Sequence, residues 1–294
     1  MADAVQDQAA GLRRLAAAQP VKTIAITGGK GGVGKTSIAI NLGTALCELG
    51  RASMLLDADL GLANVDVLLG LRTRFNLEHV VRGECSLPDV IVQAESGLRI
   101  VPASSGSLEM AMLDRKQHAG LIHAFSELFD PVDVLLIDTA AGLSEMVLTY
   151  TEASQRVVVV VCDDPASLTD AYGLIKVMLR REPACRIEVV SSMVESPAAG
   201  RALFDKLARV TSRFLKVVPG YLGAIPHDEH LRRAVQQQRS VVECYPWSAS
   251  ARAFKKLAAA ADNWDMAAGA KGRLEFFVER MLRTQAQRPE SVLQ

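Results

Sequence analysis

Hydrophobic positions along the chain follow two alternating patterns. Short apolar runs rich in β-branched residues recur, and most are separated by longer segments whose apolar residues repeat every three or four positions. The short runs predict strands at 21–27, 52–57, 98–101, 132–138, 157–162, 187–193 and 217–225. The longer segments predict helices at 37–49, 117–128, 143–153, 167–180, 198–214, 229–237 and 249–261. This alternation is typical of an α/β fold with a single doubly wound, mostly parallel sheet and helices on both faces.

A glycine-rich run joins the first predicted strand to the first predicted helix. It follows the phosphate-loop pattern G-x-x-x-x-G-K-[ST]. Its glycines let backbone N–H groups turn toward an anion, and the helix amino terminus adds partial positive charge. We predict that Lys35 contacts the β- and γ-phosphates and that the Thr36 hydroxyl binds Mg²⁺. The predicted nucleotide contacts in this run are Gly29, Lys30, Gly31, Gly32, Val33, Gly34, Lys35, Thr36 and Ser37.

Carboxylates follow two other predicted strands. Asp57 and Asp59 stand in D-x-D spacing after one strand, and Asp138 ends a run of four apolar residues as in a Walker B strand. Because the carboxyl ends of parallel strands meet at one edge of a sheet, these side chains are expected near the phosphate loop. Asp138 would then hold the Mg²⁺ shell. The alternatives are solvated aspartates for the D-x-D pair and a helix cap for Asp138.

Composition narrows the functional classes. The 294 residues are 49% hydrophobic with a formal net charge of zero, which suits one large α/β domain and gives no support for bulk binding of nucleic acid. Aromatic residues make up 5%, which disfavours a base-stacking surface. The five cysteines form no C-x-x-C pair, which argues against a zinc site. Without an apolar signal core or a stretch of transmembrane length, we expect a cytoplasmic protein.

Both ends of the chain carry a helical pattern outside the α/β core. In residues 1–20, Val5, Ala9, Leu12 and Ala16 share one helical face, which suits either docking in a partner's groove or a solvated helix. Residues 266–294 contain an apolar stripe flanked by arginines, typical of an interfacial amphipathic helix or of a helix docked on the body. The stripe consists of Leu274, Phe277, Val278, Met281 and Leu282. The core between these ends, residues 21–265, is the predicted ATPase domain.

The motifs together resemble the MinD/ParA family of deviant Walker ATPases, within the SIMIBI class of P-loop NTPases. The resemblance rests on residues 30–36, 57–66 and 138–142 and covers nearly the whole chain. It implies a slow Mg²⁺-dependent ATPase that forms a face-to-face homodimer with ATP. It also implies that Lys30 reaches the nucleotide of the partner subunit and that Asp59 orients the attacking water.

The remaining roles of the phosphate site follow from the same resemblance. Lys30, Lys35 and Asp59 are the implied catalytic residues. The implied Mg²⁺ residues are Thr36, Asp57 and Asp138, and Asn64 would line the dimer face.

Within this family, the terminal elements resemble the branch that regulates flagellar number. The motif D-Q-A-x-x-L-R implies binding of an FlhF-type GTPase through Asp7, Gln8, Leu12 and Arg13. The C-terminal helix implies reversible contact with the inner face of the cell membrane. A flagellar transcriptional activator and C-ring proteins are further implied partners, and no direct contact with nucleic acid is expected.

The base side of the site departs from the family pattern. The family commonly places an asparagine near the end of the sixth strand, where this chain has Ser192 followed by Met193. A serine hydroxyl cannot present the paired donor and acceptor of an amide. Pro226 and Asp228 match the family's second base-side segment, and ATP remains the expected nucleotide.

Three alternatives remain at this point. A division-site placement ATPase of the MinD type normally starts almost directly at the first strand, so residues 1–20 argue against it. A ParA-type DNA-partitioning ATPase is disfavoured by the neutral charge. A scaffold that binds partners without hydrolysis is disfavoured by the intact set of Lys35, Thr36, Asp59 and Asp138.

Overall fold

The computed structural model describes residues 21–59, 65–102 and 131–265, with a few isolated positions between 117 and 128. The terminal segments 1–20 and 266–294 and half of the predicted helix 117–128 lie outside the described residues. The same holds for Asn64 and for all the predicted partner-binding and membrane-binding residues: Asp7, Gln8, Leu12, Arg13, Leu274, Phe277, Val278, Met281 and Leu282.

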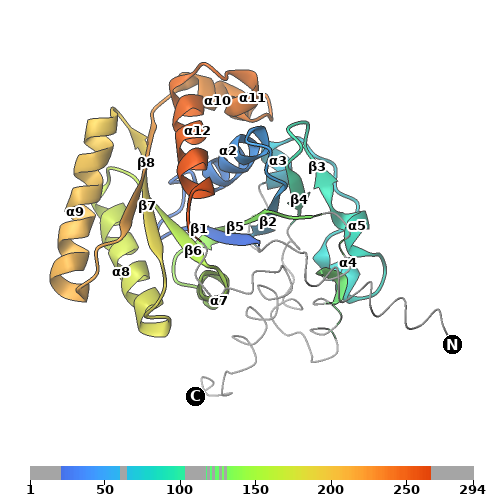
Figure 1. The fold of residues 1–294 in the computed structure, drawn as a ribbon, viewed down its shortest axis with the longest axis horizontal. Coiled ribbons are helices and arrows are strands. Elements are labelled where there is room, and N and C mark those ends of the chain that lie inside the picture. Colours follow the sequence, from blue (N-terminus) through green and yellow to red (C-terminus); the bar gives the residue numbers. More distant parts are fainter. Residues whose placement is uncertain are drawn as a thin grey trace.

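The described strands form one eight-stranded sheet in the order β3-β4-β2-β5-β1-β6-β7-β8 (Figure 1). Neighbouring strands are parallel except β3 and β4. The sheet therefore confirms the predicted fold class. Its strands are β1 (Lys22–Gly28), β2 (Ser53–Ala58), β3 (Val92–Gln93), β4 (Arg99–Val101), β5 (Val134–Ala141), β6 (Arg156–Val161), β7 (Ile187–Val194) and β8 (Gly220–Pro226).

Helices cover both faces of this sheet. Their bounds are α2 (Lys35–Glu48), α3 (Val65–Leu68), α4 (Leu77–Val81), α5 (Leu87–Val90), α7 (Glu145–Ala153), α8 (Pro165–Arg181), α9 (Pro197–Leu215), α10 (Glu229–Gln236), α11 (Val241–Cys244) and α12 (Ala249–Asp262). Helices α2 and α12 lie on one side, and α7 and α8 lie on the other (Figure 1). Among the helices that the structure describes, none combines the length and the hydrophobicity that a membrane span requires.

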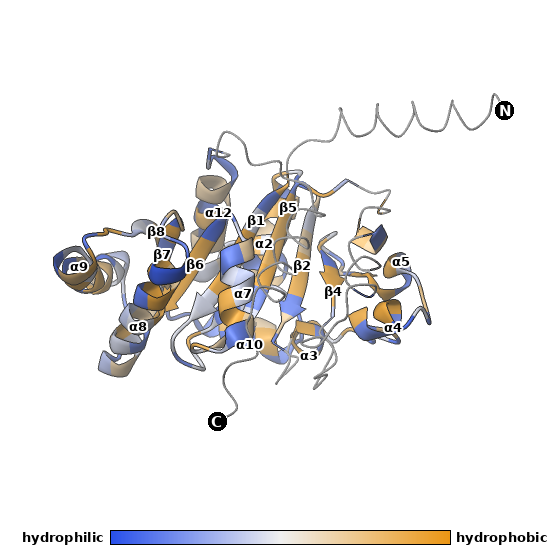
Figure 2. Ribbon diagram, turned by 90° about the horizontal axis from the view of Figure 1, so that it is seen from below, coloured by the Kyte–Doolittle hydropathy of each residue, from blue (hydrophilic) through white to orange (hydrophobic). Residues whose placement is uncertain are grey.

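Side chains along β1 point alternately to the two faces of the sheet, and this explains why helices must cover both faces. Ile24 and Ile26 belong to the core beneath α2 and α12, whereas Ala25 belongs to the core beneath α7 and α8. Strands buried on both faces read as continuous apolar runs, and the central strands are hydrophobic along most of their length (Figure 2). The sheet therefore holds its carboxyl-terminal edge, where the predicted site lies, on a rigid base.

Most predicted elements appear within one to three residues of their expected bounds. Helix α2 begins at Lys35 rather than at residue 37, and β8 begins at Gly220 rather than at residue 217. The short elements α3, α4, α5, α11 and β3 were not predicted. Each has only two to five residues, which is too few to show a hydrophobic period.

Packing of α12 on α2 is expected to carry much of the stability. Phe254 on α12 is fully buried in the same core as Leu42 and Leu46 of α2. We predict that Phe254→Ala lowers the free energy of unfolding by about 3–5 kcal/mol, because the lost ring leaves a cavity. Urea unfolding measures this change. The matched control is Phe214→Ala, whose ring is 61% exposed and should cost much less; equal losses would contradict the packing argument.

Candidate functional site

The glycine-rich run forms the turn between β1 and α2. Gly32 and Gly34 have φ angles of 75° and 91°, in the left-handed region that glycine adopts without strain. Among the described residues, no side chain caps the start of α2, and its first turn contains no acidic residue. The first N–H groups of α2 therefore stay available to an anion.

Gly29 brings this loop into direct backbone contact with α8. A Cβ atom on Gly29 would lie 2.4 Å from the carbonyl carbon of Asp170, far inside any allowed distance. By contrast, a Cβ on Gly31 would meet no described atom within 4 Å. The phosphate loop thus rests on α8 at Gly29 and is open at Gly31.

The two strand-end aspartates lie next to each other. Asp57 on β2 is in register with Asp138 on β5, and both are buried. Burial raises the pKa of Asp138 to about 7; a hydrogen bond from Thr36 opposes this rise, and the nearby Asp57 carboxylate adds to it. Thr36 therefore contacts Asp138.

The donor set at this point fits a hard cation. Oδ1 of Asp138 is buried and has no hydrogen-bond partner among the described residues. A buried carboxylate oxygen without a hydrogen-bond partner is unfavourable unless a ligand binds it. Carboxylate and hydroxyl oxygens are the ligands that Mg²⁺ prefers. The residues that would hold Mg²⁺ are Asp138 and Thr36, with Asp57 beside them.

Lys35 lies within the same group of charges. Its side chain is largely buried, and burial lowers its pKa, while the carboxylates of Asp138 and Asp59 oppose that shift. A buried cation beside carboxylates at the start of α2 is placed to balance further negative charge, such as that of phosphates.

Asp57 has a second role that its motif did not reveal. Its Oδ1 accepts a hydrogen bond from the N–H of Asp59 at 3.1 Å, and its Oδ2 accepts one from the N–H of Val65 at 3.3 Å. Asp57 thus holds Asp59 and the start of α3 at the same time.

Lys30 forms an ion pair with Asp164 of the same chain. The hydrogen bond and charge of Asp164 raise the pKa of Lys30, and the hydrogen bond from Lys30 lowers the pKa of Asp164. Asp164 is also the N-cap of α8 and accepts the N–H of Ala166 at 2.9 Å. Sequence reasoning missed Asp164. Its Asp-Pro dipeptide signals a helix start, but nothing in the pattern names Lys30 as its partner.

The residues predicted to contact the nucleotide base differ in their exposure to solvent. Ser192 is buried, and its Oγ lies 3.3 Å from the position a Cβ of Gly34 would take. Met193 is 39% exposed with a φ of 54°. Pro226 ends β8 and Asp228 follows it. These residues line the end of β7 and β8, and their contact with a base remains a prediction.

Asp228 already has many partners within the chain. It accepts N–H groups from His230 and Ser250, each at 2.9 Å, and the Ser250 hydroxyl at 2.8 Å. Burial acts to raise its pKa, but these hydrogen bonds outweigh burial and lower the pKa to about 2. The carboxylate therefore caps α10 and ties it to α12.

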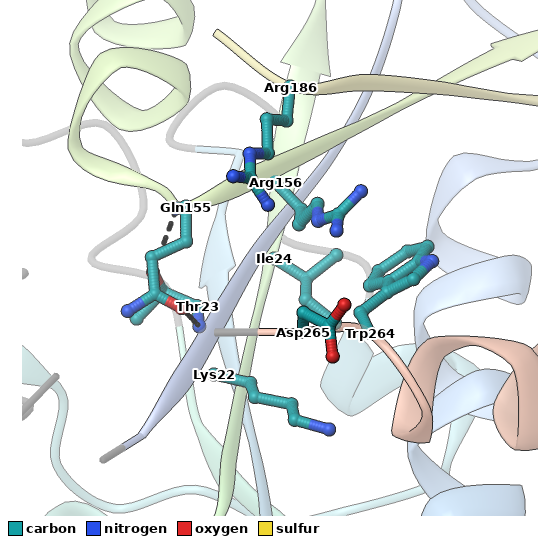
Figure 3. A pocket seen from close by; sticks show the side chains of 8 residues that line it. All are labelled: Lys22, Thr23, Ile24, Gln155, Arg156, Arg186, Trp264 and Asp265. Atoms are coloured by element: carbon teal, nitrogen blue, oxygen red, sulfur yellow. Dashed lines mark hydrogen bonds between the residues drawn. The ribbon is translucent and has the colours of Figure 1, made fainter. Parts of the chain in front are cut away.

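A separate hollow lies at the opposite, amino-terminal edge of the sheet (Figure 3). It is lined by Lys22, Thr23, Ile24, Gln155, Arg156, Arg186, Trp264 and Asp265. The Arg156 guanidinium lies 4.9 Å from the centre of the Trp264 ring and pairs with Glu188 at 2.7 Å. This hollow lies between the end of α12 and the sheet, and it is separate from the phosphate loop.

A phosphate loop between β1 and α2, with Asp57 and Asp138 at the ends of the next strands in the sheet, defines a P-loop nucleoside triphosphatase. The ParA family model, described as NUBPL iron-transfer P-loop NTPase, matches residues 20–261. The chain therefore belongs to the ParA family. The resemblance and the enzyme class predicted from the sequence, a MinD/ParA-type ATPase, are confirmed.

Individual relatives agree with this assignment. The chain is 52% identical to the antiactivator FleN of Pseudomonas aeruginosa over 271 residues, which are 92% of this chain and 97% of that protein. It is 33% identical to the flagellum site-determining protein YlxH of Helicobacter pylori over 226 residues, 76% of each chain. Among solved structures, MinD of Pyrococcus horikoshii complexed with Mg-ADP matches with a TM-score of 0.65 at 26% identity, covering 83% of this chain and 96% of that one.

The contact at Gly29 yields a stability prediction. Gly29→Ala should lower the free energy of unfolding by about 1–3 kcal/mol, because the added methyl group forces the loop and α8 apart. Gly31→Ala is the matched control in the same loop, because its added methyl group meets no described atom within 4 Å. Urea unfolding without nucleotide compares the two variants. If Gly31→Ala were as destabilising as Gly29→Ala, the contact with α8 would not be the cause.

The buried Asp138 predicts how stability depends on pH. Its folded-state pKa of about 7 lies above the ordinary value of 3.8, so its contribution to stability is complete below about pH 4 and is lost as the pH rises through about 7. Asp138→Asn should weaken this dependence. Urea unfolding across that range, with a chelator present, measures it, and an unchanged pH profile in the variant would contradict the assignment.

Proposed function

We propose that this chain is an ATP-dependent dimerisation switch with slow Mg²⁺-dependent ATPase activity that controls flagellar number and placement. The observation that carries the switch is Lys30, an additional lysine of the phosphate loop that forms an ion pair with Asp164. The flagellar role is supported by the similarity to FleN and YlxH.

The roles of the residues follow from their placement. Lys35 and the first N–H groups of α2 would bind the β- and γ-phosphates, and Thr36 with Asp138 would hold the cation. A Mg²⁺ ion held by these residues would neutralise negative charge that develops on the phosphates. Asp59, held through its N–H by Asp57, would orient the attacking water.

Lys30 would act in the partner subunit. Its side chain is 42% exposed and that of Asp164 is 35% exposed, so their ion pair is weak and breaks at little cost. The phosphates of a partner's nucleotide carry more negative charge than one carboxylate. In an ATP-bound dimer Lys30 would leave Asp164 and neutralise charge on the leaving oxygen.

The chain ends would carry the output of the switch. Residues 1–20 would bind an FlhF-type GTPase, with Gln8 near its nucleotide, and residues 266–294 would bind the membrane reversibly. Residues 21–265 would form the ATPase domain that controls both. A single short amphipathic helix binds a membrane weakly, so a dimer with two such helices would bind more tightly through avidity. A flagellar transcriptional activator and C-ring proteins are further candidate partners.

Size-exclusion chromatography tests the switch. The wild-type chain should elute as a dimer with Mg-ATP and as a monomer with Mg-ADP. Asp59→Ala should retain the ATP dimer, because hydrolysis no longer releases it.

Substitution of Lys30 tests the mechanism in trans. Lys30→Ala should stay monomeric with ATP and lower the ATPase rate by about 10²-fold or more, because it loses the cation that stabilises the transition state. Phosphate release measures this loss. Lys22→Ala, at the opposite edge of the sheet, is the control with a lost lysine outside the site. Normal dimerisation and hydrolysis in Lys30→Ala would refute the mechanism.

A further inference from the structure

The turn that ends α10 contains a residue in a costly conformation. Gln238 has a φ of 55°, in the left-handed region. The N–H of Gln238 donates to the carbonyl of Val235, and that of Arg239 donates to the carbonyl of Ala234, each at 3.0 Å. This is the Schellman pattern, whose left-handed position is usually glycine, and a side chain there is unfavourable for the turn itself.

The side chain of Gln238 contacts α3, which is far away in the sequence. Its Nε2 donates to the carbonyl oxygen of Val67 at 2.8 Å. Its Oε1 lies 2.9 Å from where a Cβ of Gly70 would be, so the glycine leaves room for the glutamine. Helix α3 has only four residues and cannot hold its own conformation without such outside contacts.

The other end of α3 is bound to the phosphate site. Asp57 accepts the N–H of Val65 at the start of α3, and its second oxygen accepts the N–H of Asp59. Helix α3 is therefore fixed at one end by the residue that also holds Asp59, and at the other end by Gln238.

The same turn is also fixed to α2. Oδ1 of the buried Asn41 accepts the Ser240 hydroxyl at 2.8 Å and the N–H of Val241 at 2.9 Å. Nδ2 of Asn41 donates to the carbonyl of Ser37 at 2.7 Å, next to Thr36. Residues 238–241 thus link the helix that starts with Lys35 to the short helix that shares an anchor with Asp59.

We propose that Gln238 is a positioning residue for hydrolysis. Its amide fixes α3 relative to α2 and thereby sets the position of Asp59 against Lys35 and Thr36. Gln238 acts through α3 and does not touch the nucleotide. The proposal deepens the proposed function, because it rests on the role of Asp59 in hydrolysis.

The variant Gln238→Gly distinguishes the effect of Gln238 on the turn from the effect of its contact with α3. Glycine suits the left-handed position, so the unfolding midpoint should stay the same or rise. The hydrogen bond to Val67 is lost, so kcat for ATP should fall roughly fivefold while KM changes little. A merely structural role would move stability and leave kcat unchanged. Arg239→Ala, which removes the neighbouring exposed side chain and its pair with Glu95, should keep the wild-type kcat.

Hydrogen exchange provides a readout that does not need activity. The N–H groups of Leu69 and Leu71 bond to Val65 and Asp66, so their exchange reports on α3. Both should exchange faster in Gln238→Gly than in the wild type or in Arg239→Ala. Unchanged exchange, or faster exchange with a wild-type kcat, would overturn the proposal. A wild-type chain that hydrolyses no ATP would instead refute the proposed function, and the exchange comparison would still test the contact.

Discussion

Two carboxylates side by side in the interior are the constraint on which the site depends. Asp57 and Asp138 are in register on neighbouring strands and are both buried, so their charges must be compensated by what surrounds them. The compensation comes from Lys35, from the Thr36 hydroxyl and from the backbone N–H groups of Asp59 and Val65. The start of α2 and the start of α3 are thus both fixed by the same pair of acids, and one oxygen of Asp138 is left for a cation.

The strand order explains how distant parts of the chain meet there. Because β5 lies between β1 and β2, the phosphate loop and both acidic strand ends lie at neighbouring positions along one edge. Helix α8 then supports the loop from the side through the contact at Gly29, and it supplies Asp164 as the partner of Lys30. The loop is therefore held by the sheet, by α2 and by α8 together.

The sequence alone was sufficient to predict those parts of the site that are formed by residues close together in the chain. The phosphate loop, Asp57, Asp59 and Asp138 could be predicted because each comes directly after a clear run of apolar residues that forms a strand. The contacts that connect these parts could not be predicted in this way. Lys30 and Asp164 are 134 positions apart, and Gln238 and Val67 are 171 apart, so no local pattern pairs them. Helix α3 is too short to have a period, and its position follows from such distant contacts.

The two ends of the described core lie at the edge of the sheet away from the phosphate loop. Lys22 and Arg51 both pair with Asp262, and Arg156 stacks on Trp264, so the start of β1 and the end of α12 are joined there. A strand of seven residues spans roughly 23 Å. Nucleotide binding at the phosphate loop could then alter the affinity for a partner or a membrane only of segments that are attached to the core at this far edge. By thermodynamic reciprocity, a bound partner or membrane would then change the affinity for nucleotide by the same factor.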